Sequence, residues 1–385
     1  MPEEHFTRKF VHDLRAHEPE MLRLLGRFVR AESPSYNKHA VDQFGRIVAV
    51  EWRKRGASVR ILHQNQRGNH LLVRFWRGPG RPKGRILLLG HLDTVYDQGA
   101  LAAMPFRVAR GRAWGPGTFD MKGGLVLALA AVDALARAGI HPRKEIACLW
   151  TSDEEIGSEC SRRDIEREAR LSDAVLVLEP AAEPRGALKT ARKGVGEIEL
   201  RVTGRAAHSG LKPETGINAV HELALQIARV AKFNQPRLGI GVNVNIAAGG
   251  TRPNVIAPEA HAVVDLRVAR VSDIPRIEKR FRALRPILPG AKLEVVGGVS
   301  RPPMERKMSA ALYRKAQALA SDLGMKLEEQ SVGGGSDGNL TAAIGVPTLD
   351  GLGAVGADAH SLSENIIVKE LGPRAALIAA LLATL

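Results

Sequence analysis

A short apolar run from Ile86 to Leu89 ends abruptly in the stretch GHLD at residues 90–93. The run is too short and too continuous for an amphipathic helix, and it indicates a buried strand of a parallel sheet. Because ligands of open α/β sheets bind just beyond the carboxyl ends of strands, His91 lies where chemistry is expected. Asp93 is near enough to accept a hydrogen bond from one ring nitrogen of His91, which would leave the other nitrogen for a metal. Taken alone, the stretch fits equally well a histidine that only caps a loop.

The same arrangement recurs along the chain. Apolar runs at 145–151, 174–178 and 346–349 each indicate a strand, and each is followed by acidic residues or by a loop with a histidine. A further acidic residue precedes a helix expected over the Leu- and Ala-rich residues 125–139. The ionisable residues placed in this way are His91, Asp120, Glu154, Glu155, Glu179 and His360. Since loops at one edge of a sheet converge in space, these side chains could share one site.

This set of side chains predicts a metal site. Two histidines with several carboxylates and no thiolate suit a hydrolytic metal of intermediate hardness, namely zinc, cobalt or manganese. More than three carboxylates in one place repel one another strongly unless cations neutralise them. Two divalent metals with a bridging carboxylate would provide that neutralisation. We therefore expect an enzyme with two divalent metal ions, with zinc favoured over cobalt and manganese.

The pattern changes between residues 193 and 300. Segments of alternating polarity, such as GEIELRV and HAVVDLRVA, flank amphipathic helices expected at 217–233 and 274–287. The order βαββαβ predicts a smaller α+β domain inserted into a larger α/β domain with a mainly parallel sheet. The predicted limits are 1–192 and 301–385 for the catalytic domain, which is discontinuous, and 193–300 for the inserted lid or dimerisation domain.

The composition favours a small acidic substrate over nucleic acid as the partner. Hydrophobic residues make up 44% of the 385 residues, enough for a core, and the formal charge of +15 could attract an anionic partner. The basic residues are scattered, however, and aromatic residues amount to 4%, too few to stack on bases. Neither Cys148 nor Cys160 belongs to a C-x-x-C pair, so the sequence predicts no disulfide framework and no zinc site made of thiolates. Without a signal peptide or an apolar run of about 18 residues, a cytoplasmic protein with no membrane partner is expected.

A series of short motifs spans nearly the whole chain. They are GHLDTV (90–95), GPGTFDMKGG (115–124), TSDEEIGS (151–158), LEP (178–180), GRAAHSG (204–210), RPNVIAP (252–258), DLR (265–267), GGGSDGN (333–339) and AHS (359–361). The set and its order resemble the dinuclear-zinc exopeptidases and deacylases, the family of glutamate carboxypeptidase, acetylornithine deacetylase and succinyl-diaminopimelate desuccinylase. The GPG before Asp120 and the GGGSDGN motif resemble the glutamate carboxypeptidase branch most.

The resemblance implies a metal-binding role for five residues. Asp120 would bridge the two metals. His91 and Glu179 would complete one site, and Glu155 and His360 the other. The fold implied is the one expected above, an α/β catalytic domain with an inserted lid.

Other matched residues would act in catalysis. By resemblance, Glu154 would be the general base, which takes a proton from the metal-bridging water and delivers it to the leaving nitrogen. Asp93 would orient His91. His208, in the inserted domain, would stabilise the oxyanion, usually in the active site of a second copy of the chain. The resemblance therefore implies a homodimer that forms through the inserted domain.

Further matches concern the substrate. Asn254 and Arg267 match positions that hold a substrate carboxylate, and Gly335 and Ser336 belong to a loop whose backbone N–H groups face the substrate. In the stretch GALKTARKG (186–194), the match to a glutamate carboxypeptidase is unclear. The basic candidates there for a second carboxylate contact are Lys189, Arg192 and Lys193.

The resemblance implies metal-dependent hydrolysis of an amide bond next to a free carboxylate. A glutamate-carboxypeptidase-like exopeptidase would act on a small acidic peptide or an N-acyl amino acid. An N-acyl-amino-acid deacylase, like acetylornithine deacetylase or the desuccinylase, is the alternative within this class. A non-catalytic binding protein on the same fold is a more distant alternative, disfavoured because no ligand position is substituted.

Overall fold

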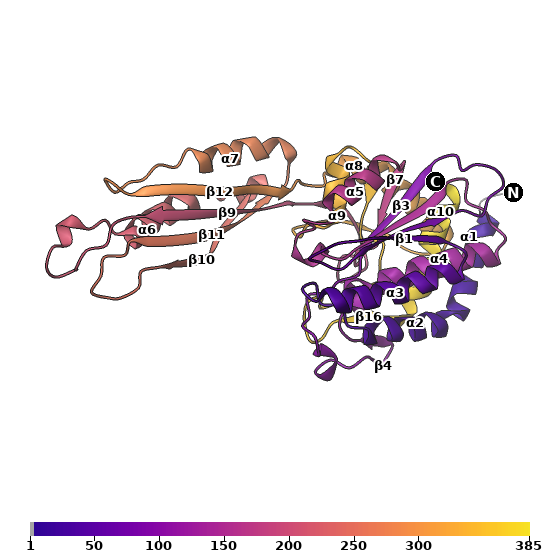
Figure 1. Ribbon diagram of the computed structural model, residues 1–385. Helices are drawn as coiled ribbons and strands as arrows, with labels where there is room; N and C mark the ends of the chain where they lie inside the picture. Colours follow the sequence, from indigo (N-terminus) through magenta and orange to yellow (C-terminus); the bar gives the residue numbers. More distant parts are fainter. Residues whose placement is uncertain (1–3) are drawn as a thin grey trace. The chain divides into compact units, whose positions relative to one another are not determined.

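The computed structural model describes the backbone of residues 4–385 and the side chains of residues 10–385, and these form two compact units (Figure 1). The first unit consists of the described residues up to Ala191 together with Arg306–Val332 and Ser336–Leu385. The second consists of Arg192–Glu305 together with Gly333–Gly335. The α/β fold with a smaller antiparallel unit is confirmed. The domain limits expected from the sequence, with 193–300 as the insertion, remain a prediction.

The first unit is built on a six-stranded sheet. In spatial order its strands are β1 (Ser58–Leu62), β2 (His70–Phe75), β6 (Glu145–Thr151), β3 (Arg85–His91), β7 (Ala174–Val177) and β14 (Thr348–Leu349). The strands β6, β3, β7 and β14 pair in parallel, while β2 is antiparallel to both β1 and β6. The parallel strands therefore bring their carboxyl ends to the same edge of the sheet.

Helices cover both faces of this sheet (Figure 1). The core on one face is shared with α1 (Glu4–Ala16), α2 (Glu18–Arg30), α3 (Lys38–Lys54), α4 (Gly123–Arg137), α8 (Arg306–Asp322) and α10 (Leu371–Thr384), and the core on the other with α5 (Arg162–Arg170) and α9 (Asp337–Ala343). In β3, Ile86 and Leu88 belong to the first core, whereas Leu87 and Leu89 belong to the second. Burial on both faces explains why the sequence of β3 is apolar without interruption.

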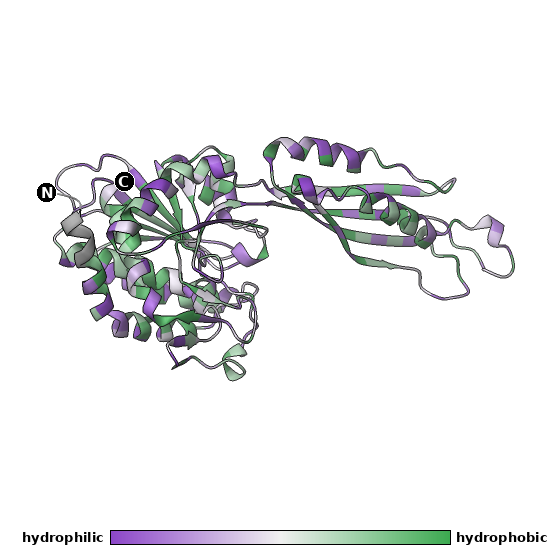
Figure 2. Ribbon diagram, turned by 180° about the vertical axis from the view of Figure 1, so that it is seen from behind, coloured by the Kyte–Doolittle hydropathy of each residue, from purple (hydrophilic) through white to green (hydrophobic). Residues whose placement is uncertain are grey.

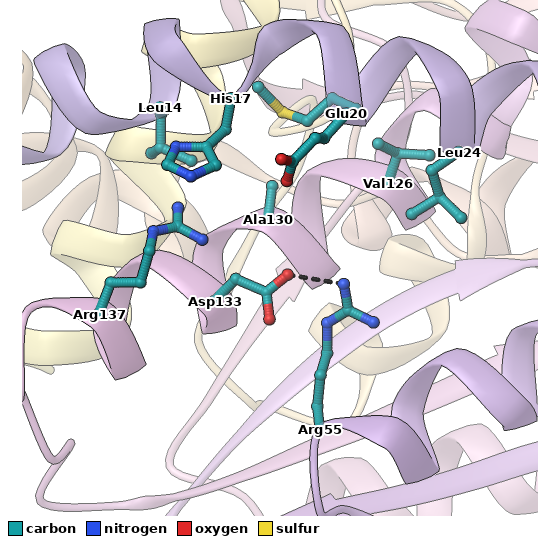
Figure 3. A pocket seen from close by; sticks show the side chains of 10 residues that line it. Leu14, His17, Glu20, Leu24, Arg55, Val126, Ala130, Asp133 and Arg137 are labelled. Atoms are coloured by element: carbon teal, nitrogen blue, oxygen red, sulfur yellow. Dashed lines mark hydrogen bonds and ion pairs between the residues drawn. The ribbon is translucent and has the colours of Figure 1, made fainter.

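A cavity of about 60 Å³ lies among α1, α2 and α4 in the helical layer (Figure 3). Charged side chains on its wall form ion pairs. Nη2 of Arg55 lies 2.6 Å from Oδ2 of Asp133, and Nη2 of Arg137 lies 2.6 Å from Oδ2 of Asp13. These pairs link α4 to the end of α3 and to α1, so this cavity belongs to the packing of the helical layer.

Residues 97–119 contain two short strands. β4 (Arg107–Ala109) and β5 (Arg112–Trp114) form a hairpin, and β5 pairs with β16 (Asn365–Ile367), which pairs with β15 (Gly356–Ala357). Strands of two or three residues are too short to show alternation, and β16 lies far away in the sequence, so sequence patterns missed this sheet. A separate ladder joins β8 (Leu188–Arg192) to β13 (Glu329–Val332).

The second unit is a four-stranded antiparallel sheet with two helices packed on it. Its strand order is β10 (Gly241–Gly249), β11 (Glu259–Val268), β9 (Gly194–Thr203) and β12 (Lys292–Arg301). The helices α6 (Ala219–Ala231) and α7 (Ile274–Arg282) bury Leu223 and Phe281 in the core of this unit. In Figure 2 its strands show hydrophobic (green) and hydrophilic (purple) stretches in turn, whereas the central strands of the first unit are mainly hydrophobic.

The helix expected at 274–287 ends earlier, at Arg282. Pro286 explains this, because a proline disfavours helical geometry at the residue before it.

Within residues 4–385, none of the helices combines the length and the apolar character that a membrane crossing requires.

The packing of α4 against the end of β7 generates a prediction about Gly124. A Cβ atom added there would lie 2.2 Å from the carbonyl oxygen of Leu178, which follows β7. We expect Gly124→Ala to lower the free energy of unfolding by about 1–3 kcal/mol through overpacking, although alanine favours helices. Thermal unfolding followed by circular dichroism measures the effect.

The matched control is Gly45→Ala in α3. Its added Cβ would meet Leu92 Cδ1 at 3.5 Å, an ordinary contact, so the helix preference of alanine should leave the unfolding temperature unchanged or raise it. Equal effects of the two substitutions would contradict the close approach of α4 to Leu178.

Candidate metal centre

Five side chains from different elements converge beyond the carboxyl edge of the six-stranded sheet. His91 ends β3, Asp120 lies in the turn before α4, and Glu179 lies just beyond β7. Glu155 belongs to a short helical turn after β6, and His360 lies in the loop between β15 and β16. Their nitrogen and oxygen atoms form two groups that share Asp120, and within each group the atoms lie within 4.8 Å of one another. The structure thus brings together all five residues that the sequence nominated as metal ligands.

Asp120 lies between the two histidines. Its Oδ1 is 3.2 Å from Nε2 of His91, and its Oδ2 is 3.2 Å from Nε2 of His360. The same nitrogen of His91 is 3.4 Å from Glu179 Oε1, and that of His360 is 3.2 Å from Glu155 Oε2. Each histidine therefore directs one ring nitrogen at two carboxylates, and the two oxygens of Asp120 serve different groups. A carboxylate that bridges two cations needs this arrangement.

Burial and mutual charge perturb the pKa values of both histidines and of Glu155. Burial, together with the charge of Asp120, raises the pKa of Glu155 to about 8. Hydrogen bonds to Asp120 and Glu155 raise the pKa of His360 to about 10. Burial alone would lower the pKa of His91, but its carboxylate partners raise that pKa well above its usual value. The carboxylates thus favour a positive charge at both histidines, and divalent cations could supply that charge in place of the protons.

The donor set fits two divalent cations. It consists of two imidazole nitrogens and three carboxylates without a thiolate, which suits zinc, cobalt or manganese. Glu155 Oε1 is buried and has no hydrogen-bond partner among the described residues. Because an unpaired buried carboxylate oxygen is costly, a cation beside it would remove an unfavourable contribution.

Asp93 faces His91 with both its main chain and its carboxylate. Its backbone carbonyl oxygen lies 3.0 Å from Nδ1 of His91, while its carboxylate Oδ1 is 3.5 Å from that nitrogen. The carboxylate also accepts hydrogen bonds from the backbone N–H groups of Glu154 and Glu155, each at 3.3 Å, and from the Ser35 hydroxyl at 2.8 Å. Asp93 therefore contacts Nδ1 of His91 and, through its side chain, fixes the turn that carries the acidic pair.

Glu154 shares this turn with Glu155 but has a different position in the cluster. Among the residues that the structure describes, it contributes no atom to either group of potential ligands. The neighbouring carboxylates thus differ in their surroundings, as the division between a ligand and a base requires.

His208 and Asn254 lie together in the second unit. The backbone N–H of Ser209 donates to the carbonyl oxygen of Asn254 at 3.0 Å, which joins the two loops. The exposed ring of His208 accepts a hydrogen bond at Nδ1 from the N–H of Gly210, at 3.1 Å. This bond assigns the proton of a neutral His208 ring to Nε2.

Arg267 also lies in the second unit, but at the other end of its sheet. The Asn254 loop precedes the start of β11, where Ala260 pairs with Gly249, whereas Arg267 near the end of β11 pairs with Gly241. The strand advances seven residues from Ala260 to Arg267, or roughly 23 Å at the usual rise per residue. The Arg267 guanidinium forms hydrogen bonds of 2.9 to 3.0 Å with Asp265 on the same strand.

Ser336 caps α9. Its hydroxyl donates to Asp350 at 2.6 Å and accepts from the N–H of Gly338 at 3.1 Å. Its backbone N–H donates to the Asn339 side chain at 3.0 Å. Ser336 is fully buried, and its N–H and hydroxyl both have partners inside the protein, so its contact with substrate remains a prediction.

Arg192 is buried and supports the glycine-rich loop. Its Nη1 donates to the carbonyl oxygens of Gly334 and Gly335, at 3.1 Å each. Residues 333–335 belong to the second unit, as Arg192 does, although their neighbours in sequence belong to the first. Gly335 thus lies in a loop whose carbonyl groups accept hydrogen bonds from the buried guanidinium of Arg192.

Sequence reasoning missed Ser35 and Glu364. Ser35 lies in a Ser-Pro-Ser stretch between α2 and α3, and nothing in that pattern indicates a bond to Asp93. Glu364 lies three residues beyond the AHS motif and is fully buried beside the turn of Asp120. An acidic residue just after a histidine ligand is a weak signal, because most such residues face solvent.

Comparisons with known proteins agree with this geometry. The sequence model of peptidase family M20/M25/M40 matches residues 87–384. Carboxypeptidase G2 from a Pseudomonas species is 32% identical over 352 residues, which cover 89% of this chain and 84% of that protein. A succinyl-diaminopimelate desuccinylase from Stenotrophomonas maltophilia is 28% identical over 317 residues, covering 77% of this chain and 83% of that protein.

Solved structures share the fold. An M20 family metallo-carboxypeptidase from Sulfolobus solfataricus superposes with a TM-score of 0.75 at 16% identity, covering 94% of this chain and 98% of the other. Aminopeptidase PepT from Bacillus cereus gives a TM-score of 0.78 at 20% identity, covering 95% and 98%. Both combine with the family match to support an α/β catalytic unit that carries a second unit.

Proposed function

The chain belongs to the peptidase family M20/M25/M40 and is a metal-dependent hydrolase of that family, and we propose that it acts as a glutamate-carboxypeptidase-like exopeptidase. It would cleave the amide bond next to the free carboxylate of a small acidic peptide or N-acyl amino acid. The observation that carries the reaction class is the position of Asp120, whose two oxygens each face a different histidine. The 32% identity to carboxypeptidase G2 supports the choice of substrate.

In this proposal Asp120 would bind both of two divalent cations, with zinc as the favoured metal. His91 and Glu179 would hold one cation, and Glu155 and His360 would hold the other. When bound, such cations polarise the scissile carbonyl group and lower the pKa of a water molecule. The main chain of Asp93 keeps Nε2 of His91 directed at the cluster, because Nδ1 faces its carbonyl oxygen.

Glu154 is the proposed general base. Its carboxylate removes a proton from the attacking water, the water oxygen bonds to the amide carbon, and the carbon–nitrogen bond breaks. Glu154 then delivers the proton to the leaving nitrogen, which departs as an amine. The hydrogen bonds from Glu154 N–H and Glu155 N–H to Asp93 hold the base next to the ligand.

His208 is proposed to donate Nε2–H to the oxyanion, and Asn254 and Arg267 to hold the substrate carboxylate. Within one chain these residues cannot all reach one small substrate, since Arg267 and the loop of His208 lie at opposite ends of β11. If all of them serve one site, His208 and Arg267 must come from different copies. We therefore propose a homodimer in which the second unit of one copy completes the site of the other.

The first prediction concerns the substrate and the metal. The zinc- or cobalt-loaded protein should release the terminal amino acid from dipeptides and N-acyl amino acids that end in Glu or Asp. Chelation should abolish this activity, and added zinc, cobalt or manganese should restore it. The assay measures the amine set free from a panel that also contains N-acetylornithine and an N-succinyl amino acid.

The panel separates the alternatives. A preference for N-acetylornithine or for the N-succinyl substrate would show that the protein is a deacylase and not a carboxypeptidase. The 28% identity to a desuccinylase is the reason to include the N-succinyl substrate. Full activity in a metal-free preparation, or no hydrolysis of any member by the loaded protein, would refute the proposal.

The second prediction separates the base from its neighbouring ligand. Glu154→Gln removes a proton acceptor but no metal contact, so the variant should keep both metals and lose at least about 10²-fold in kcat. The matched control is Glu155→Gln, which should lose metal. Metal content and steady-state kinetics are measured on both, and a fall in the metal content of Glu154→Gln would show that the division is wrong.

The third prediction tests the dimer. Neither His208→Ala, which retains metal, nor His360→Ala, which loses it, should be active alone. In a mixture that exchanges subunits, half of the dimers contain one site with both histidines, so about a quarter of the wild-type activity should return. Exchange is verified with differently tagged copies, and no recovery despite exchange would show that His208 acts within its own chain or not at all.

A further inference from the structure

Glu364 is a fully buried carboxylate at the centre of a network of hydrogen bonds next to the metal cluster. Its Oε1 accepts from the backbone N–H groups of Phe119 at 2.7 Å and Asp120 at 2.9 Å. Its Oε2 accepts from the N–H of Gly117 at 3.0 Å and from the Tyr96 hydroxyl at 2.5 Å. Three backbone donors of one turn thus converge on a single side chain, together with the phenol of Tyr96.

This turn departs from helical geometry at the residue shared by the two groups of potential ligands. Asp120 has φ −113° and ψ 96°, outside the helical region, and its N–H donates to Glu364 at 2.9 Å. Hydrogen bonds to a charged acceptor are roughly twice as strong as those between neutral groups, and burial strengthens them further. Glu364 therefore provides a strong hydrogen-bond acceptor for the backbone N–H of Asp120, the residue that both groups of potential ligands share.

The same network reaches the loop of His360. Glu364 follows His360 by four residues, and the Tyr96 hydroxyl lies 2.9 Å from the carbonyl oxygen of Ser361. In addition, the N–H of Gly115 faces the carbonyl oxygen of Glu364 at 3.4 Å. One side chain is thus bonded to the turn of Asp120 and lies in the loop of His360.

Glu364 is not itself a ligand. Among the described residues it contributes no atom to either group that could hold an ion, and its two oxygens are occupied by four donors. Resting on the function proposed above, we propose that Glu364 is a positioning residue that sets the distance between Asp120 and His360. It thereby shapes the cation site formed by Asp120, Glu155 and His360.

The test uses Glu364→Gln, which preserves the size of the side chain. A glutamine presents one acceptor oxygen and one NH₂ group, so at least one backbone N–H of the turn would face another donor. Loss of such a partner next to a metal ligand costs about 10–100-fold in metal affinity. In a titration of the metal-free protein with zinc, we expect one of the two cations to bind about 10–100-fold more weakly.

Kinetics give a second readout. At limiting zinc, kcat of Glu364→Gln should fall, KM should stay near the wild-type value, and added zinc should restore much of the loss. The matched control is Glu183→Gln, because exposed Glu183 accepts from the N–H of Asp358 at 3.2 Å, in the same loop as His360. A glutamine oxygen can accept that bond, so this control should bind both cations as the wild type does.

Tyr96→Phe provides an independent variant should Glu364→Gln fail to fold. It removes only the hydroxyl between Glu364 and Ser361, and it should weaken the same cation by a smaller factor. Wild-type affinity for both cations in Glu364→Gln would overturn the inference, as would an unfolded Glu364→Gln combined with wild-type affinity in Tyr96→Phe. Failure of the wild type to bind two cations would instead refute the proposed function itself.

Discussion

Repulsion among buried carboxylates at the edge of a parallel sheet is the constraint on which the rest of this structure depends. Asp120, Glu155 and Glu179 lie within a few ångströms of two histidines, and Asp93 lies directly behind them. Such a group is stable only if positive charge or hydrogen-bond donors compensate it. Backbone N–H groups donate hydrogen bonds to Asp93 and so compensate its charge. The other carboxylates and the two histidines are suitable ligands for two divalent cations, which would compensate the remaining negative charge.

Much of this arrangement could be predicted from the sequence, for a physical reason. Parallel strands buried on both faces are uninterrupted apolar runs, and their carboxyl ends lie at one edge, so the residues after each run must be neighbours. This rule, with the family motifs, gave the positions of His91, Glu155 and Glu179. Asp120 and His360 depended more on the motifs, because neither directly follows a long strand.

Other features depend on contacts that no local pattern contains. The carboxylate of Asp93 bonds to a turn some sixty residues away, and Glu364 bonds to a turn that lies even farther off in sequence. The strands β4 and β16 are too short to show a period. Ser336 matched a substrate loop by motif, yet in three dimensions its polar groups cap a helix. Long-range pairing and the direction of a side chain therefore limited the prediction more than the choice of elements did.

The central claim is that Asp120 links two cations, and anomalous X-ray diffraction from crystals of the zinc-loaded protein tests it most directly. Data collected on both sides of the zinc absorption edge locate each ion without assumptions about its ligands. We expect two peaks, one beside His91 and Glu179 and one beside Glu155 and His360, each next to a different oxygen of Asp120. A single peak, or two peaks of which one does not contact Asp120, would contradict the claim.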